Sequence, residues 1–161
     1  MQIFFPREEG TEIRATILPE VAKKFTDLGI EVVVETEIGS NIFLPDESYQ
    51  QAGAIISTDR SKSLSEADIV CRINKPKLEE ISILKRNSIH VSFLDPFNEK
   101  ELVNEFAKAG ISAISMELVP RITMAQKMDA LSSQANLAGY SAVITASKTL
   151  TKSFPMMMTA A

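Results

Sequence analysis

Residues 19–35, PEVAKKFTDLGIEVVVE, join a helix pattern directly to a strand pattern. Pro19 favours a helix start, and apolar residues then recur on one face as far as Leu28. Gly29 follows where a helix is expected to end, because glycine tolerates the left-handed backbone that a helix cap often needs. The β-branched run at 31–35 is typical of a buried strand. This stretch therefore predicts a helix that leads through a tight turn into a sheet.

The same alternation of patterns extends over most of the chain. Further strands are predicted at 2–5, 54–57, 68–73, 89–93 and 111–116. Further helices are predicted at 45–52, 64–67, 78–84 and 98–109. Short turns marked by glycine or proline separate them, which indicates parallel strands with helices on both faces. We predict an α/β fold with an open parallel sheet, Rossmann-like or flavodoxin-like, followed by a long C-terminal helix.

Length and composition limit the class of protein. The 161 residues suit one domain with a real core, and the net charge of −4 gives no basic footprint for nucleic acid. Cys71, the only cysteine, lies in an apolar run and is expected to be a buried structural thiol. Because no run approaches about 18 apolar residues and the start is too soon acidic for a signal peptide, we expect a soluble cytoplasmic chain.

Charged residues follow several predicted strands. Open parallel sheets place their sites at the carboxyl ends of the strands. Four charged residues fall at such ends and are expected to line one rim: Arg7, Lys75, Asp95 and Arg121.

The glycines exclude a dinucleotide cradle within the sequence. The six glycines, at 10, 29, 39, 53, 110 and 139, never approach the spacing of G-x-G-x-x-G or of a P-loop. His90 is the only histidine and has no second soft ligand beside it, so no metal site is predicted. Because His90 alternates with Val91 in a strand, we expect a surface or hydrogen-bonded histidine.

Residues 120–140, PRITMAQKMDALSSQANLAGY, carry the candidate chemistry. Apolar residues recur there at helical spacing: Met124, Met128, Leu131, Ala135, Ala138 and Ala142. Two starts of this helix are open. Thr123 and Gln126 match a capping box, or 120–127 is an exposed loop and the helix begins near Met128. Gly139 within the helix suggests close approach of a partner backbone.

RITMAQKMDALSSQANLAGY at 121–140 resembles the N-terminal half of the alpha subunit of proton-translocating NAD(P) transhydrogenase, which is its NAD(H)-binding component. The resemblance covers the whole chain, including IFFPRE, EIRATILPE, NKP and the closing MMTAA. It implies that the chain takes part in hydride transfer between NADH and NADP⁺ coupled to proton translocation. It also favours the loop interpretation of residues 121–129.

The resemblance implies roles for particular residues. Arg121 and Asp129 would contact the nicotinamide end and brace each other. Gln126 would touch the nicotinamide ribose and help to bring the second nucleotide close. The full set of implied cofactor-binding residues is Arg121, Gln126, Lys127, Met128, Asp129, Ser132 and Tyr140. No catalytic acid, base or nucleophile is implied, because hydride transfer is the cofactor's own reaction.

The resemblance also implies a domain plan. Residues 1–121 would be the α/β domain, 122–150 the nicotinamide-facing loop and long helix, and 151–161 a connection to a nucleotide domain beyond the sequence. The implied partners are an NADP(H)-binding component, a membrane domain and a second copy, with peripheral attachment to the inner membrane. We expect the chain alone to be inactive and to bind NAD(H) weakly or not at all. Met124 and Lys127 depart from the arginine and serine usual in the family.

Two other hypotheses are open. An alanine dehydrogenase would use Arg14 and Lys75 to hold a keto acid, but Asp95 stands where that enzyme has a histidine. Arg14 and Lys75 are therefore expected to be salt-bridged scaffold residues. Alternatively, the chain is a non-catalytic docking or dimerisation domain whose apolar end, FPMMMTAA at 154–161, contacts a missing neighbour.

Overall fold

The computed structural model describes residues 1–152 and residue 154. The chain divides into two compact units, Met1–Met116 and Glu117–Ala161, and each is described by itself. The predicted connection at 151–161 lies mainly outside the described residues.

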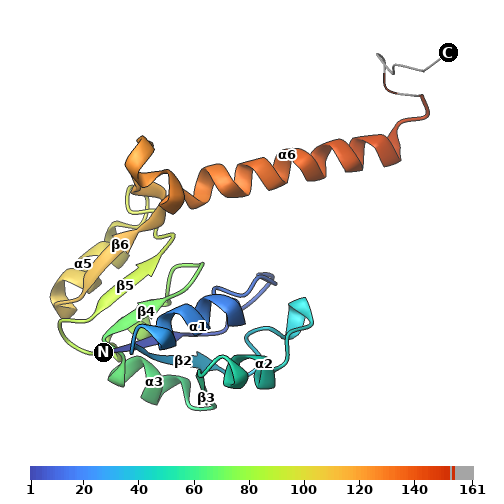
Figure 1. Ribbon diagram of the computed structural model, residues 1–161. Coiled ribbons are helices and arrows are strands. Elements are labelled where there is room, and N and C mark those ends of the chain that lie inside the picture. The colour runs from blue at the N-terminus through green and yellow to red at the C-terminus, as the bar shows by residue number, and fades with distance from the viewer. Residues whose placement is uncertain (153, 155–161) are drawn as a thin grey trace. The chain divides into compact units, whose positions relative to one another are not determined.

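Residues 1–116, all of them described, form one parallel sheet of six strands in the order β3-β2-β1-β4-β5-β6 (Figure 1). The strands are β1 (Gln2–Phe5), β2 (Glu31–Glu35), β3 (Ile55–Ser57), β4 (Ile69–Cys71), β5 (Ile89–Ser92) and β6 (Ser112–Ser115). The register pairs Phe4 with Val33 on one side and with Val70 on the other. The predicted parallel α/β sheet is therefore confirmed, with some strands a residue or more shorter at their ends than predicted.

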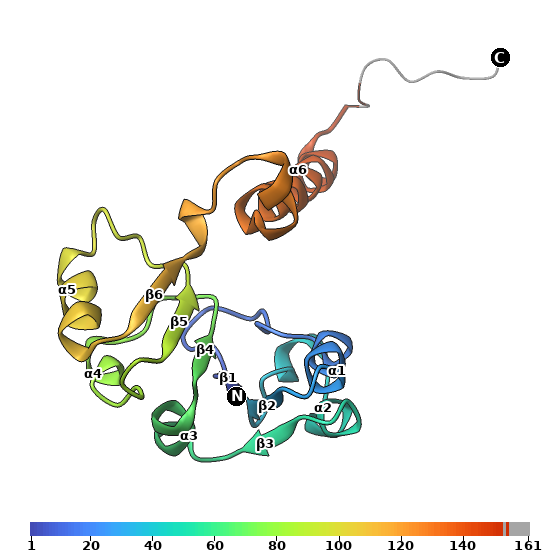
Figure 2. The ribbon, with the colours of Figure 1, turned by 60° about the vertical axis from the view of Figure 1, so that its left-hand side comes forward.

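Helices cover both faces of this sheet (Figure 2). They are α1 (Pro19–Asp27), α2 (Asp46–Gln51), α3 (Arg60–Glu66), α4 (Leu78–Ile81) and α5 (Lys100–Ala109), with the 3₁₀ turn η1 (Ser40–Ile42). Alternate strand residues enter opposite cores, as the twofold repeat of a strand requires. Ile3 and Phe5 join the core with α1 and α2, whereas Phe4 joins the core with α3, α4 and α5.

Helix α3 begins four residues earlier than the single turn predicted at 64–67. Asp59 is its N-cap, and the carboxylate accepts a hydrogen bond from Lys62 N at 2.9 Å. Such a cap satisfies an amide that the helix itself leaves unpaired. The prediction of a single turn did not take this capping residue into account, and only Ser63 and Leu64 of the helix are buried.

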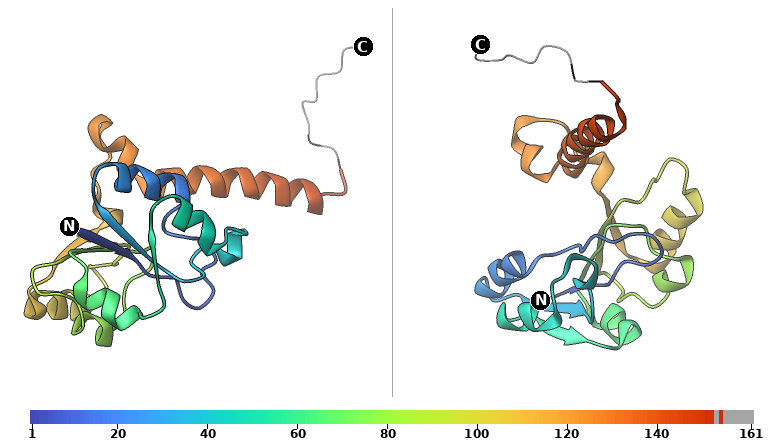
Figure 3. Two further views of the ribbon diagram at one scale, coloured as in Figure 1. Left: turned by 60° about the horizontal axis from the view of Figure 1, so that its bottom comes forward. Right: turned by 90° about the vertical axis from the view of Figure 1, so that its right-hand side faces the viewer.

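In the second unit, the 3₁₀ helix η3 (Thr123–Met128) precedes the single continuous helix α6 (Ala130–Thr149) (Figure 3). The helix start near Met128 is thus closer to the structure than the capping box. Ile122 precedes η3 without a side-chain cap, and Asp129 caps α6. No residue of α6 is buried. Within the described part of the chain, no helix is long and apolar enough to cross a membrane.

Candidate functional site

A cup of about 320 Å³ opens on the surface of the second unit. It is lined by Arg121, Ile122, Thr123, Gln126, Asp129 and Ser132. Four of the seven residues expected to bind the cofactor are therefore gathered around one hollow.

The 3₁₀ geometry of η3 explains this gathering. Residues three apart lie almost directly above one another in a 3₁₀ helix, so Thr123 and Gln126 face the same side and Asp129 continues the row. Ala125 is buried, and its amide donates to Ile122 O at 3.0 Å. The buried alanine thus turns the polar side chains of η3 outward into the cup.

Asp129 is fixed by the start of α6. Its Oδ1 accepts a hydrogen bond from Ser132 N at 2.9 Å, and its Oδ2 accepts one from Ser132 Oγ at 2.6 Å. These hydrogen bonds, with a smaller contribution from the charge of Arg121, lower the pKa of Asp129. The side chain is therefore a carboxylate at neutral pH, and the Ser132 hydroxyl keeps its lone pairs available to accept from a ligand.

Arg121 faces the cup without touching the carboxylate opposite. Among the described residues, no hydrogen bond or ion pair joins Arg121 to Asp129. The cup thus holds a guanidinium, an amide and a carboxylate, with the guanidinium left available for a ligand.

The other three expected residues lie outside the lining of the cup. Lys127 and Met128 belong to η3 but are not in the row of Thr123 and Gln126, and Tyr140 lies on α6. All three side chains are exposed.

The charged residues at the strand ends of the first unit are engaged locally. Arg7 Nη1 lies 2.6 Å from Glu37 Oε2, and Lys75 forms an ion pair with Glu99. Asp95 accepts from the side-chain amide of Asn98 at 2.9 Å. Each of these three charged groups therefore binds a neighbouring side chain of the first unit, and together they do not form a set of free charges for a ligand.

Arg14 is likewise occupied. Its guanidinium donates to both carboxylate oxygens of Glu12, with Nη2 at 2.6 Å from Oε2. The hydrogen bonds from Arg14 lower the pKa of Glu12 to about 2. The expectation that Arg14 and Lys75 are salt-bridged is confirmed.

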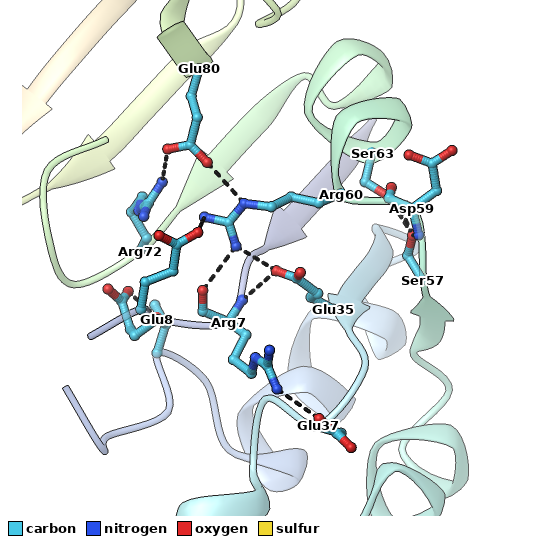
Figure 4. Close-up of polar contacts among 12 residues, drawn as sticks. Arg7, Glu8, Glu35, Glu37, Ser57, Asp59, Arg60, Ser63, Arg72 and Glu80 are labelled. Carbon is cyan, nitrogen blue, oxygen red and sulfur yellow. Dashed lines mark hydrogen bonds and ion pairs between the residues drawn. The ribbon is translucent and has the colours of Figure 1, made fainter. Parts of the chain in front are cut away.

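A partly buried ion-pair network around Arg60 was not predicted from the sequence (Figure 4). Arg60 Nε donates to Glu80 Oε1 at 2.8 Å, and Nη1 donates to Glu35 Oε2 at 2.6 Å and to Arg7 O at 3.0 Å. These contacts join Glu35, at the end of β2, to segments that follow β1, β3 and β4. Arg60 therefore ties together the carboxyl ends of four strands.

Arg72 extends this network beneath α4. Its Nη1 donates to Glu80 Oε2 at 2.8 Å, and only 4% of its side chain is exposed. Burial raises the pKa of Glu80, but the charges of Arg72 and Arg60 outweigh burial and the net pKa is lowered. An arginine inside the apolar run DIVCRI was the sequence signal for this buried pair.

His90 and Cys71 are both scaffold groups. Of the two expected situations, a surface or a hydrogen-bonded histidine, the structure shows the second: His90 is fully buried, with Nε2 3.2 Å from Ser92 Oγ and its ring beside Phe106. Burial, helped by the charge of Arg72, lowers the pKa of His90 to about 3. Cys71 is partly buried, and burial raises the pKa of its thiol to about 11. Within the described residues, no three potential ligands cluster to hold a metal.

Comparison with known proteins gives consistent matches. The family "Alanine dehydrogenase/PNT, N-terminal domain" matches residues 4–138. The first part of the NAD(P) transhydrogenase subunit alpha of Rhodospirillum rubrum is 40% identical over 167 residues, covering 100% of this chain and 44% of that protein. "Alanine dehydrogenase 1" of Staphylococcus aureus is 33% identical over 108 residues, covering 67% of this chain and 28% of that protein.

A solved structure extends the likeness to three dimensions. The crystal structure of transhydrogenase from Sinorhizobium meliloti superimposes with a TM-score of 0.89 at 40% identity, covering 99% of this chain and 48% of that chain. The chain thus spans less than half the length of these transhydrogenase relatives.

Proposed function

Because this chain belongs to the alanine dehydrogenase/PNT N-terminal domain family, we propose that it is the N-terminal part of the NAD(H)-binding component of a proton-translocating NAD(P) transhydrogenase. The observation that carries this proposal is the cup that gathers Arg121, Gln126, Asp129 and Ser132. Its donors and acceptors match what a nicotinamide ring and its ribose present, and its one carboxylate, Asp129, is already hydrogen-bonded to Ser132.

Different residues of the cup bind different groups of the cofactor. Arg121 donates to the carboxamide oxygen, and the Ser132 hydroxyl, whose proton is held by Asp129, accepts from the carboxamide nitrogen. Gln126 donates to and accepts from the ribose hydroxyls without adding charge. Lys127, Met128 and Tyr140 would contact the cofactor from outside the cup.

These contacts serve orientation. A dihydronicotinamide supplies the hydride when bound, so the protein has to hold two rings in register and keep water away. Asp129 stabilises the start of α6 and fixes the Ser132 hydroxyl, which sets the angle of the carboxamide. The guanidinium and the carboxylate leave the cup neutral overall, so they do not oppose the change of charge on the ring.

The proposal requires further protein. The sequence lacks a glycine-rich cradle for the pyrophosphate, which we assign to residues that follow in the relatives. We further propose that the chain works with an NADP(H)-binding component, a membrane domain and a second copy, as a peripheral component at the inner membrane. The chain alone should then be inactive.

An alanine dehydrogenase is the weaker candidate. Arg14 and Lys75, which would hold a keto acid, are already neutralised by Glu12 and Glu99. Asp95 supplies no imidazole for proton transfer.

The test is deuteride transfer from 4-deuterated NADH to NADP⁺, measured by mass spectrometry in an enzyme containing this chain and its missing components. Gln126→Leu should lower the transfer rate at least tenfold with a smaller change in NADH affinity, because the amide is needed mainly to bring the two rings together. Lys23→Gln, an exposed change on α1, should leave the rate unchanged.

Two outcomes would contradict the proposal. One is a Gln126→Leu variant with the rate of the unaltered enzyme. The other is micromolar NADH binding by the 161-residue chain in a calorimetric titration, since that chain lacks the pyrophosphate cradle.

A further inference from the structure

The loop between β2 and α2 presents a phenylalanine to solvent. Phe43 is 95% exposed and has a left-handed backbone, with φ 60° and ψ 28°. A bulky side chain rarely adopts this conformation, so the surrounding structure must hold it there.

The loop is held from both ends. Asp46 accepts from Glu37 N at 2.8 Å and from Thr36 Oγ1 at 2.7 Å. Leu44 N donates to Gly39 O at 3.0 Å. A Cβ at Gly39 would lie 2.5 Å from Leu44 O, so the turn depends on glycine there. The backbone that carries Phe43 is therefore held in place, with the aromatic side chain in solvent.

Phe43 forms one wall of a hollow of about 570 Å³, which we call the Phe43 groove. The groove is lined by Glu37, Ser40, Phe43, Leu44, Pro45, Asp46 and Glu47. Three of these residues, Phe43, Leu44 and Pro45, are apolar. Three others, Glu37, Asp46 and Glu47, carry carboxylates.

These carboxylates are only partly neutralised. Glu37 is paired with Arg7 at 2.6 Å (Figure 4). Asp46 accepts only from the uncharged donors of its own loop, and Glu47 has no hydrogen bond or ion pair within the described residues. An apolar wall beside uncompensated negative charge is complementary to a long cationic side chain.

We propose that the Phe43 groove receives an arginine or lysine side chain from a basic segment of a protein partner. The aliphatic stem packs on Phe43, Leu44 and Pro45, and the cationic head lies against Glu47 and the face of the Phe43 ring. The proposal rests on residues of the first unit alone and does not depend on the proposed function. The net negative charge of the chain disfavours a second copy as the occupant.

The experiment is an NMR titration of the ¹⁵N-labelled chain with the peptide acetyl-Gly-Arg-Gly-amide. Its control is the same peptide with citrulline, which has the same shape without charge. We expect saturable amide shifts at residues 40, 43, 44, 46 and 47 with the arginine peptide alone, residue 45 being a proline without an amide proton. Phe43→Ser and Glu47→Gln should each weaken binding at least threefold. Phe97→Ser, at another exposed phenylalanine, should not change it.

Other results would overturn the proposal. They are the absence of saturable shifts, equal shifts with the citrulline peptide, or unchanged binding by Phe43→Ser in a folded, well-dispersed spectrum. Phe43-dependent self-association in sedimentation would make a second copy the occupant. Phe43-dependent binding to phosphatidylcholine vesicles would make the loop a membrane contact.

Discussion

The two units of this chain use polar side chains in opposite ways. In the first unit, Arg60 and Arg72 both donate to the carboxylate of Glu80, which is only 12% exposed. In the second unit, Arg121 and Gln126 face an open cup, and the long helix α6 buries no residue of its own. The first arrangement completes a fold, whereas the second leaves groups available to a ligand.

The two units also differ in the source of their stability: the first has its own apolar cores, whereas no residue of α6 in the second is buried. A helix that is apolar around its circumference and nowhere buried needs packing from other protein. Apolar residues stand on opposite sides of α6, with Leu131 and Ala135 on one and Leu137 and Ile144 on the other. The first unit should therefore tolerate isolation, and the second should reach its working form only with the remainder of the enzyme.

The largest expected effect tests the first arrangement. Arg60→Ala leaves the Glu35 carboxylate, whose side chain is 15% exposed, without its ion-pair partner, whereas Glu80, 12% exposed, keeps Arg72. We expect the free energy of unfolding to fall by about 3 kcal/mol in urea denaturation, because an unpaired buried charge is costly. Lys62→Ala, an exposed change on the same helix, should alter it by less than about 0.5 kcal/mol. A loss below about 1 kcal/mol for Arg60→Ala would show that the network contributes little.

The next effect is a pH dependence from His90, the only histidine. Its pKa is lowered from 6.5 to about 3, so the folded state binds fewer protons than the unfolded state. The contribution of neutral His90 to the free energy of unfolding is fully present above pH 6.5. It is lost progressively as the pH decreases towards 3, and the loss is about 2 kcal/mol at pH 5. Urea midpoints between about pH 8 and 5 measure this fall. His90→Gln should flatten the profile over this range, and an equally steep profile in that variant would assign the slope to carboxylates.

The fold was predictable because its signals are local. β-branched runs such as 31–35 and the turn at Gly29 specify strands and helix ends within a few residues of sequence. The row of polar residues in η3 could be predicted in part, because the sequence shows the three-residue spacing of Thr123, Gln126 and Asp129. Its conformation as a 3₁₀ helix, which aligns the row, was not.

The Arg60 network could not be predicted in the same way. Arg60 and Glu35 are 25 positions apart, and Arg60 and Glu80 are 20 apart. Only the crossover order of parallel strands brings these side chains together, and sequence spacing does not contain that order. Arg72 within an apolar run was the visible part of the network.

A smaller effect compares two helix caps of the same chemistry. Asp59 caps α3 and Asp129 caps α6, and each accepts from an amide three residues on at 2.9 Å. Removal of either costs about 1 kcal/mol. Because buried Leu64 still anchors α3, Asp59→Ala should keep its helix formed. Asp129→Ala should instead fray the first turn of α6, seen as about fivefold faster amide hydrogen exchange at 132–134. Equal local exchange in both variants would contradict the contrast.

The smallest effect compares two glycines. Gly29 has φ +76°, so Gly29→Ala should destabilise the first unit by about 1 kcal/mol. Gly139 lies within α6, and an added methyl group there would meet nothing within 4 Å, so Gly139→Ala should stabilise that helix by about 0.5–1 kcal/mol. Circular dichroism during thermal unfolding measures both changes. If α6 packs closely on other protein through this face, the same methyl group should reduce deuteride transfer in the complete enzyme. A Gly139→Ala variant that is more helical alone and fully active when assembled would exclude close packing at this face.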